Sequence, residues 1–272
     1  MIGKYAEMLK SAGIGNFQNE ARWLVLETLG LSSSALFTDY VPTPEQCALL
    51  DELLFRRCQH EPLQYILGSA PFGEIDLKVT PAVLIPRCET ELLVEYVVKH
   101  LPENGSLLDV GCGSGAISLL SAYRRRDIAV TALDKSPEAL AVAGENARQL
   151  SLADRVIFVA SDLLSALAGE KFDIIAANLP YVTFDEYETL SPEVRDFEPQ
   201  LALTAPDEGM ALIVELIRSA PRFLVSGGRI VLEMSPHQTN RAEAALTENG
   251  FTEIEIFPDQ FGKMRFAAAI LK

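Results

Sequence analysis

A short apolar strand that runs directly into a glycine-rich loop constrains the fold of this chain more than any other feature. The strand is Leu107–Val110 (L-L-D-V), the loop is Gly111–Gly115 (G-C-G-S-G), and the helix-like stretch Ala116–Leu120 follows at once. Glycines let a backbone approach a ligand closely, and the start of a helix presents N–H groups without partners. This order of elements predicts a ligand-binding loop.

Beyond residue 88 the sequence alternates between strand-like and helix-like segments. We expect strands near residues 106–110, 128–133, 156–160, 172–177 and 228–234, with helices between them. Such alternation predicts an α/β fold with a doubly wound, mostly parallel sheet. The last two strands, 253–257 and 264–271, have no helix between them. We therefore expect them to pair antiparallel at one edge of the sheet.

The first 70 residues have a different character, because their apolar residues recur at helical spacing. Thr43-Pro44-Glu45-Gln46 combines a capping Thr, a Pro at the first helical position and a Gln three residues after the cap. An earlier helix around Glu20–Leu29 ends at Gly30, a usual C-cap residue. We therefore predict an N-terminal helical domain over residues 1–70.

Between the two parts, Phe72–Val79 and Ala82–Ile85 are expected to form two short strands around Thr80-Pro81. This predicts a β-hairpin linker over residues 71–87 and a second domain over residues 88–272.

Composition excludes several classes of protein. The four cysteines show no C-x-x-C spacing and the three histidines are far apart, so no metal site and no disulfide framework is expected. No basic-then-apolar leader opens the chain and no apolar run reaches about 18 residues, which predicts a soluble, cytoplasmic protein that does not bind a membrane. A net charge of −15 disfavours direct binding to nucleic acid, because Lys and Arg supply most of that affinity.

Two cofactors are compatible with the glycine loop. Asp134 follows it by about 20 residues, at the end of the next strand, where a carboxylate can accept hydrogen bonds from ribose hydroxyls. Gly111, Gly113 and Ala116 satisfy the dinucleotide pattern G-x-G-x-x-[G/A]. However, the Asp109 carboxylate would lie close to a pyrophosphate of the same charge, which is costly. S-adenosylmethionine is therefore favoured, with its charged amino-acid end at Asp109 and the loop.

Asp162 and Leu163 follow the third strand of this domain. Asp162 is expected either to accept a hydrogen bond from the adenine amino group or to cap a helix, and Leu163 to pack on the adenine ring.

The segment Asn178–Tyr181 (N-L-P-Y) ends an apolar strand that starts near Asp173. Functional groups of open α/β sheets lie where such strands end. The Asn178 side-chain oxygen and the Leu179 backbone carbonyl can together accept both hydrogens of an NH2 group. Pro180 is expected to hold the loop, and Tyr181 to offer an aromatic face to a planar group. The alternative is an ordinary strand-to-loop turn, because Asn and Pro are common turn residues.

With these residues assembled, the chain resembles the protein-(glutamine-N5) methyltransferases that act on class I peptide-chain release factors. The resemblance is carried by Glu61–Gly68 (E-P-L-Q-Y-I-L-G), Val83–Glu91 (V-L-I-P-R-C-E-T-E), the glycine loop, Phe197-Glu198-Pro199 and Ala202-Leu203. Two positions depart from the family pattern: Cys88 replaces a Pro, and Leu179 replaces the first Pro of N-P-P-Y. N-L-P-Y is also similar to the tetrapeptide of ribosomal-RNA adenine dimethyltransferases, which lack the first two segments.

The resemblance implies a class I S-adenosylmethionine-dependent methyltransferase fold preceded by a helical substrate-recognition domain. It implies methyl transfer to the side-chain nitrogen of the glutamine in the Gly-Gly-Gln motif of release factors. The implied catalytic residues are Asn178, Leu179, Pro180 and Tyr181. The implied cofactor-binding residues are Asp109, Gly111, Cys112, Gly113, Ser114, Gly115, Asp134, Asp162, Leu163 and Asn178.

Two other functions are compatible with parts of the sequence: a nucleic-acid adenine-N6 methyltransferase, and a non-catalytic or dinucleotide-binding regulator. Arg87, Glu89 and Glu91 are expected either to form a salt-bridged lid over the cofactor or to be a solvated helix start.

Overall fold

The computed structural model describes residues 2–34 and 40–272, which form two compact units. The first, here called the helical unit, consists of the chain up to Ser69 together with Ser191–Phe197. The second, the sheet unit, consists of Ala70–Leu190 and Glu198–Lys272. The sequence did not predict that residues 191–197, which lie within the second half of the chain, group with the N-terminal helices.

Five helices make up the described part of the helical unit: α1 Ile2–Ser11, α2 Phe17–Leu29, α3 Pro44–Cys58, α4 Leu63–Leu67 and α9 Pro192–Arg195. The predicted caps are confirmed. Gly30 ends α2 in the left-handed conformation, and Thr43 forms a capping box with Gln46 at the start of α3. Fully buried leucines, including Leu24 and Leu50, form the core.

A buried ion-pair cluster ties the segment around α9 to the other helices of this unit. The Arg57 guanidinium is 3% exposed and donates to Glu20 Oε2 at 2.6 Å and to Glu193 Oε1 at 2.5 Å. It also donates to the Glu61 carbonyl oxygen at 3.2 Å. Removing one partner of a buried ion pair leaves an uncompensated charge, so breaking this cluster should destabilise the helical unit.

We predict that Arg57→Ala lowers the free energy of unfolding of the helical unit by about 3–5 kcal/mol, the cost of breaking a buried ion pair. Trp23, the only tryptophan, packs against the core of this unit, so its fluorescence in a urea titration reports the unfolding. Arg56 is the matched control, because its side chain is 38% exposed and pairs with Glu61. Arg56→Ala should cost about 1 kcal/mol or less. Equal losses in the two variants would contradict the assigned role of Arg57.

The sheet unit contains a seven-stranded sheet in the order β5-β4-β3-β6-β7-β9-β8. Its strands are β3 Ser106–Val110, β4 Ala129–Asp134, β5 Val156–Ala160, β6 Phe172–Asn178, β7 Leu224–Glu233, β8 Phe251–Pro258 and β9 Met264–Leu271. The first five are parallel, and β9 pairs antiparallel with both β7 and β8. The predicted α/β class, the parallel sheet and the antiparallel final pair are confirmed.

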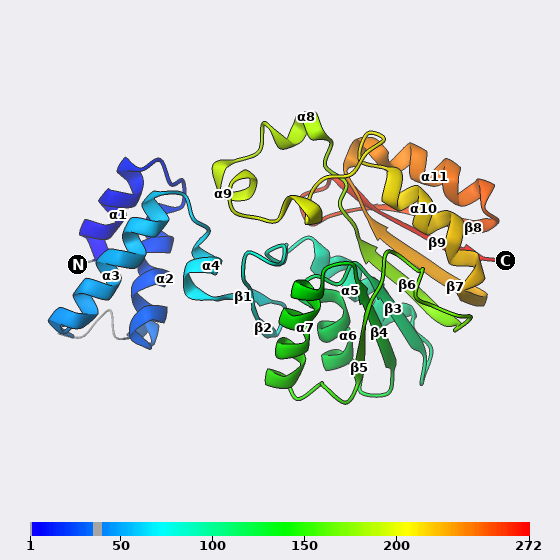
Figure 1. Ribbon diagram of the computed structural model, residues 1–272, viewed down its shortest axis with the longest axis horizontal. Helices are drawn as coiled ribbons and strands as arrows, with labels where there is room; N and C mark the ends of the chain where they lie inside the picture. The colour runs from blue at the N-terminus through cyan, green and yellow to red at the C-terminus, as the bar shows by residue number, and fades with distance from the viewer. Residues whose placement is uncertain (1, 35–39) are drawn as a thin grey trace. The chain divides into compact units, whose positions relative to one another are not determined.

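Helices cover both faces of this sheet (Figure 1). One face carries α5 Thr90–His100, α6 Ala116–Arg124 and α7 Pro137–Gln149, and the other carries α10 Ala211–Ser219 and α11 Thr239–Glu248. The shorter elements are α8 Phe184–Tyr187, η2 Gln200–Ala202, η3 Ala220–Arg222 and η4 Pro236–Gln238. The central strands are apolar on both faces because both are buried, which is why they read as continuous apolar runs.

The predicted hairpin is wrong in its position. The two-stranded sheet is formed by β1 Ser69–Phe72 and β2 Ile75–Lys78, and its turn is at Gly73-Glu74. Gly73 has a φ of +55°, which favours glycine, whereas Pro81 lacks the N–H that a strand needs. Residues 82–85 are therefore irregular, and several of them line the cavity described next.

Candidate active site

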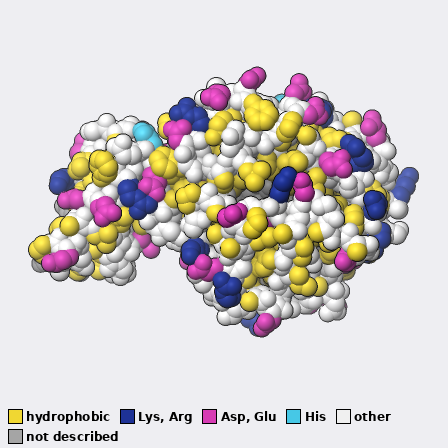
Figure 2. All heavy atoms as spheres, viewed as in Figure 1, with side chains coloured by type: hydrophobic (Ala, Val, Ile, Leu, Met, Phe, Trp, Pro, Cys, Tyr) yellow, Lys and Arg dark blue, Asp and Glu magenta, His cyan; other side chains and the backbone are white. Residues whose placement is uncertain are grey.

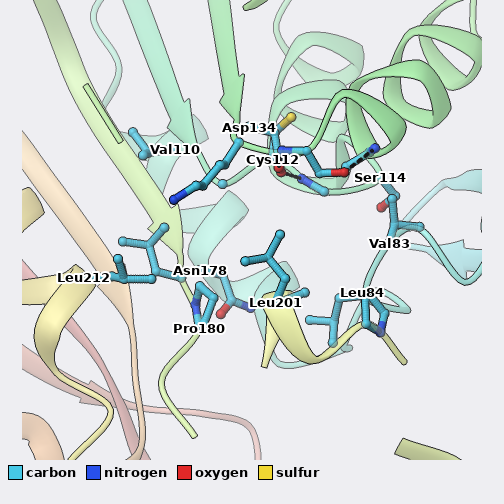
Figure 3. Close-up of a pocket in the computed structure, with 18 of the residues that line it drawn as sticks. Val83, Leu84, Val110, Cys112, Ser114, Asp134, Asn178, Pro180, Leu201 and Leu212 are labelled. Atoms are coloured by element: carbon cyan, nitrogen blue, oxygen red, sulfur yellow. Dashed lines mark hydrogen bonds between the residues drawn. The ribbon is translucent and has the colours of Figure 1, made fainter. Parts of the chain in front are cut away.

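A cavity of about 470 Å³ lies in the sheet unit at the carboxyl ends of β3, β4 and β6. It is within the range of about 300–1,000 Å³ that small-molecule sites occupy. β3 has β4 on one side and β6 on the other, so the chain order reverses there and leaves a crevice beyond the strand ends. In Figure 3, Asn178 and Pro180 lie on the opposite side of this cavity from Cys112 and Ser114 of the glycine loop.

The glycine loop is held against the sheet by its own backbone. The N–H groups of Gly111 and Cys112 both donate to the Leu133 carbonyl oxygen, at 2.8 and 2.9 Å. Gly111 has a φ of +76°, and a Cβ added to it would lie 2.9 Å from the Leu179 side chain. Glycine is therefore required here both by conformation and by the close approach of the N-L-P-Y segment.

Four of the five predicted loop residues line the cavity: Gly111, Cys112, Gly113 and Ser114. Gly115 does not, because it caps α6 and faces Leu119. Burial raises the pKa of the Cys112 thiol well above its usual value, so that thiol is a small neutral part of the wall.

Asp109 lies beneath this loop and is completely buried, so it is not part of the cavity surface. Its Oδ2 accepts a hydrogen bond from the Ser118 N–H at 3.0 Å, while its Oδ1 has no partner in the described chain. Burial raises the pKa of Asp109 to about 7, against the lowering effect of Ser118. A positive charge brought to the loop would stabilise the ionised form of this buried carboxyl group and so lower its pKa.

We predict that binding of a cationic cofactor beside the loop releases protons from Asp109. A nearby positive charge lowers the pKa of a carboxyl group, so the cofactor should bind more tightly as pH rises through about 7. Calorimetric titrations in buffers of different ionisation enthalpy should detect net proton release near pH 7. The Asp109→Asn variant should release none, and proton release that persists in it would contradict the assignment.

Asp134 faces the cavity from the end of β4. Its two oxygens accept backbone hydrogen bonds, Oδ2 from Gly113 at 2.8 Å and Oδ1 from Ser136 at 2.9 Å. An ionised carboxylate has about four acceptor sites, so both oxygens can still accept hydroxyl groups. Asp134 thus holds the loop, and its oxygens remain available to donors in the cavity.

Asp162 and Leu163 also line the cavity. The Asp162 carboxylate is exposed and pairs with Lys135 at 2.7 Å. Leu163 has a φ of +47°, unusual for a residue with a branched side chain, and Ser161 stabilises it by donating to its carbonyl oxygen at 2.6 Å. The contact of Leu163 with an adenine ring stays a prediction.

We predict that Asp134→Ala weakens S-adenosylmethionine binding by about 1.5–3 kcal/mol, the range for hydrogen bonds to a charged group. Asp162→Ala is the matched comparison, and its loss should be about 1 kcal/mol or less because this carboxylate is exposed and already paired. Calorimetry measures both values. A larger loss for Asp162→Ala would contradict the assignment of Asp134 to the ribose and of Asp162 to the adenine amino group.

The N-L-P-Y segment forms another wall of the cavity. Asn178, Leu179 and Pro180 line the cavity, and Leu179 is 4% exposed because its side chain belongs to the core beside Gly111. Tyr181 is not among the lining residues, and its hydroxyl lies 3.4 Å from Glu233 Oε1. Burial, and then the charge of Glu233, raises the pKa of Tyr181.

Two carboxylates near the site were given no role by the sequence analysis, although Glu198 belongs to one of its motifs. Glu198 is buried, accepts from Arg87 at 2.7 Å and from the Ile85 N–H at 3.3 Å, and so holds the wall segment 82–87. Arg87 therefore pairs with Glu198, not with Glu89 or Glu91. Glu233 is also buried, at the end of β7. A Glu that ends an apolar strand (R-I-V-L-E) was a signal in the sequence that could have identified it.

The residues present fit S-adenosylmethionine. The cavity offers a carboxylate for a ribose, apolar side chains for an adenine, and a buried carboxyl oxygen without a partner beneath the loop, where a positive charge would be stabilised. Among the described residues, no His, Cys, Asp and Glu side chains are grouped so that they could hold a metal ion.

The comparisons with known proteins agree with this geometry. Residues 88–191 match the family described as the methyltransferase small domain, and residues 2–68 match the one described as the PrmC N-terminal domain. A methyltransferase from Pyrococcus furiosus has a similar fold, with a TM-score of 0.54 and 18% identity over 73% of this chain and 89% of that one. Fold and site together define an S-adenosylmethionine-dependent methyltransferase.

Relatives with similar sequences show which family of methyltransferases the chain belongs to. The release factor glutamine methyltransferase of Geobacter sulfurreducens is 34% identical over 90% of this chain and 86% of its own length. That of Caulobacter vibrioides is 37% identical over 93% of this chain and 89% of its own length. That of Escherichia coli is 40% identical over 80% of this chain and 78% of its own length. The chain belongs to the release factor glutamine methyltransferase family, which confirms the resemblance found in its motifs.

Proposed function

We propose that this protein methylates the side-chain nitrogen of the glutamine in the Gly-Gly-Gln motif of class I release factors. The observation that carries the proposal is Asn178 at the cavity wall, next to a backbone carbonyl that can act with it. The printed names of the relatives support the substrate. Bound S-adenosylmethionine supplies a methyl group on a positively charged sulfur.

The chain's own residues must make a weak nucleophile reactive. An amide nitrogen is unreactive because its lone pair is delocalised into the carbonyl group, as in a peptide bond. Asn178 Oδ1 and the Leu179 carbonyl oxygen would accept the two N–H hydrogens and so favour a pyramidal nitrogen with a localised lone pair. Acceptors placed where positive charge develops stabilise the transition state more than the ground state.

Leu179 retains this function although the family usually has proline at its position. Residue 179 has a backbone carbonyl whether its side chain is that of leucine or of proline. What proline would add is a fixed φ. Here the buried Leu179 side chain packs against Gly111 and so fixes the segment by a tertiary contact, together with Pro180.

We predict that Asn178→Ala lowers the rate of methyl transfer to a release factor by about 100-fold or more, because a removed transition-state acceptor typically costs about 3 kcal/mol. Affinity for S-adenosylmethionine should stay within a few-fold. Asn240→Ala, at an exposed position of α11, is the control and should leave the rate unchanged. Near-normal turnover of Asn178→Ala, measured by transfer of a labelled methyl group, would exclude this role for Asn178.

We also propose that residues 1–70 form a domain that recognises the protein substrate, joined by residues 71–87 to a methyltransferase domain over residues 88–272. Every residue that lines the cavity lies between Ala82 and Leu212, so the cavity needs no side chain from the N-terminal helices. A helical unit without cavity residues is free to bind a protein surface distant from the glutamine.

Hydrogen exchange of the full chain tests this domain role. When a release factor binds, we predict slower exchange of backbone amides in α1–α4 as well as around the cavity, because an interface excludes water from the amides it covers. A short Gly-Gly-Gln peptide, which lacks the remaining surface of the release factor, should slow exchange only around the cavity. Slowing confined to the cavity with the intact release factor as well would contradict the proposed role.

The adenine-N6 alternative is disfavoured. Lys and Arg side chains are scattered among Asp and Glu on the face shown in Figure 2, without a continuous basic surface among the described residues there. The net charge of −15 acts against a polyanionic substrate. The described chain contains no helix with the length and apolar character that a membrane span requires. The charge supports the proposal that the partner is a protein and not a nucleic acid, and we propose that the enzyme acts in the cytoplasm.

A further inference from the structure

Three polar side chains from three different elements meet behind Asn178. Asn178 ends β6, Glu233 ends β7, and the two are direct neighbours in the parallel register of these strands. Thr90, the first residue of α5, lies between them. The Asn178 Nδ2 donates to Thr90 Oγ1 at 3.1 Å, and Thr90 Oγ1 donates to Glu233 Oε2 at 2.7 Å. Thr90 and Glu233 are 4% and 2% exposed, so water does not compete for these bonds.

The order of these bonds determines which way the Asn178 amide faces. A threonine hydroxyl has a single hydrogen, and an ionised carboxylate can only accept. Thr90 must therefore give its hydrogen to Glu233, which leaves its oxygen free only to accept. Of the two ends of the Asn178 amide, only the NH2 group can donate to that oxygen. Asn178 Oδ1 is then directed away from Thr90, and it has no donor among the described residues.

We propose that Thr90 and Glu233 are positioning residues that hold the Asn178 amide with its oxygen available to the substrate nitrogen. The inference rests on the proposed function, since it concerns the same acceptor. The two ends of an asparagine amide are nearly equal in size, so packing alone does not distinguish them. With the NH2 group turned to the substrate, Asn178 would present a donor where catalysis needs an acceptor.

The surroundings of Glu233 make this arrangement sensitive to pH. Burial raises the pKa of Glu233 to about 7, and the Thr90 hydrogen bond and the charge of Arg265 oppose the increase. The groups that face Glu233 are Thr90 and Glu89 at the start of α5, Tyr181 after β6, and Arg265 on β9, which is itself paired with Asp259 at 2.8 Å.

Protonation of Glu233 would reverse the order of donors. A neutral carboxyl group can donate to Thr90 Oγ1, and the Thr90 hydrogen is then free to turn to Asn178 Oδ1. The turnover number should therefore fall as pH decreases through about 7, because the Asn178 oxygen is drawn away from the substrate.

The test compares Thr90→Val with Thr90→Ser in the full-length enzyme acting on a release factor. Thr90→Val keeps the shape but removes the hydroxyl, and should lower kcat about tenfold or more, the factor that one lost hydrogen bond represents. Thr90→Ser restores the hydroxyl and should retain a rate within about threefold of the wild type, because the same bonds can form. The affinity for S-adenosylmethionine, measured without the substrate, should not change in either variant.

Two further measurements separate positioning from a structural role. Glu233→Gln should lower kcat and remove the dependence on pH near 7, because the glutamine does not titrate. In protein labelled with 15N at asparagine, the side-chain NH2 signal of Asn178 can be identified by its loss in Asn178→Ala. The chemical shift of this signal should change in Thr90→Val and stay the same in Thr90→Ser.

The outcomes are distinguishable from a failure of the proposed function. If the wild type does not methylate the release factor, the proposed function is wrong, while the NMR comparison still tests the orientation of Asn178. If the wild type is active but Thr90→Val and Thr90→Ser have equal rates and an unchanged Asn178 signal, the inference is overturned.

Discussion

The parallel pairing of β3 with β6 is the constraint on which the rest of the site depends. Its register places Val110 beside Ala177, so the glycine loop and the N-L-P-Y segment leave the sheet next to each other. The helix that follows β3 covers one face of the sheet, whereas the connection from β6 to β7 continues to the other. The two segments therefore border one crevice, and they touch where the Leu179 side chain contacts Gly111.

Two buried carboxyl groups give this crevice its electrostatic character. Burial raises the pKa of Asp109 and of Glu233 to about 7 in each case. Asp109 lies under the loop, and one of its oxygens has no hydrogen-bond partner among the described residues, so a positive charge bound at the loop would be stabilised there. Glu233 is satisfied by Thr90 and orders a hydrogen-bond chain that ends at Asn178. Perturbed carboxyl groups of this kind gather at functional sites because stability alone does not favour them.

The sequence was sufficient for the features that depend on local pattern. Apolar runs of strand length, glycines at the loop and capping residues at helix starts predicted the α/β sheet and the places of Asp134 and Asn178. It was not sufficient for features that depend on register between strands. Glu233 lies 55 residues after Asn178 in the chain and meets it only because β6 and β7 are in register. The sequence analysis placed the hairpin turn at Thr80-Pro81, whereas the turn forms at Gly73, whose positive φ favours glycine.

The most direct test of the central claim is a high-resolution structure of the enzyme with S-adenosylhomocysteine and a peptide containing Gly-Gly-Gln. Our account predicts that the glutamine side-chain nitrogen lies within hydrogen-bond distance, about 2.7–3.2 Å, of both Asn178 Oδ1 and the Leu179 carbonyl oxygen. The Asn178 NH2 group should still face Thr90. A glutamine nitrogen that contacts neither oxygen, or an Asn178 amide turned with its NH2 group toward the substrate, would contradict the account.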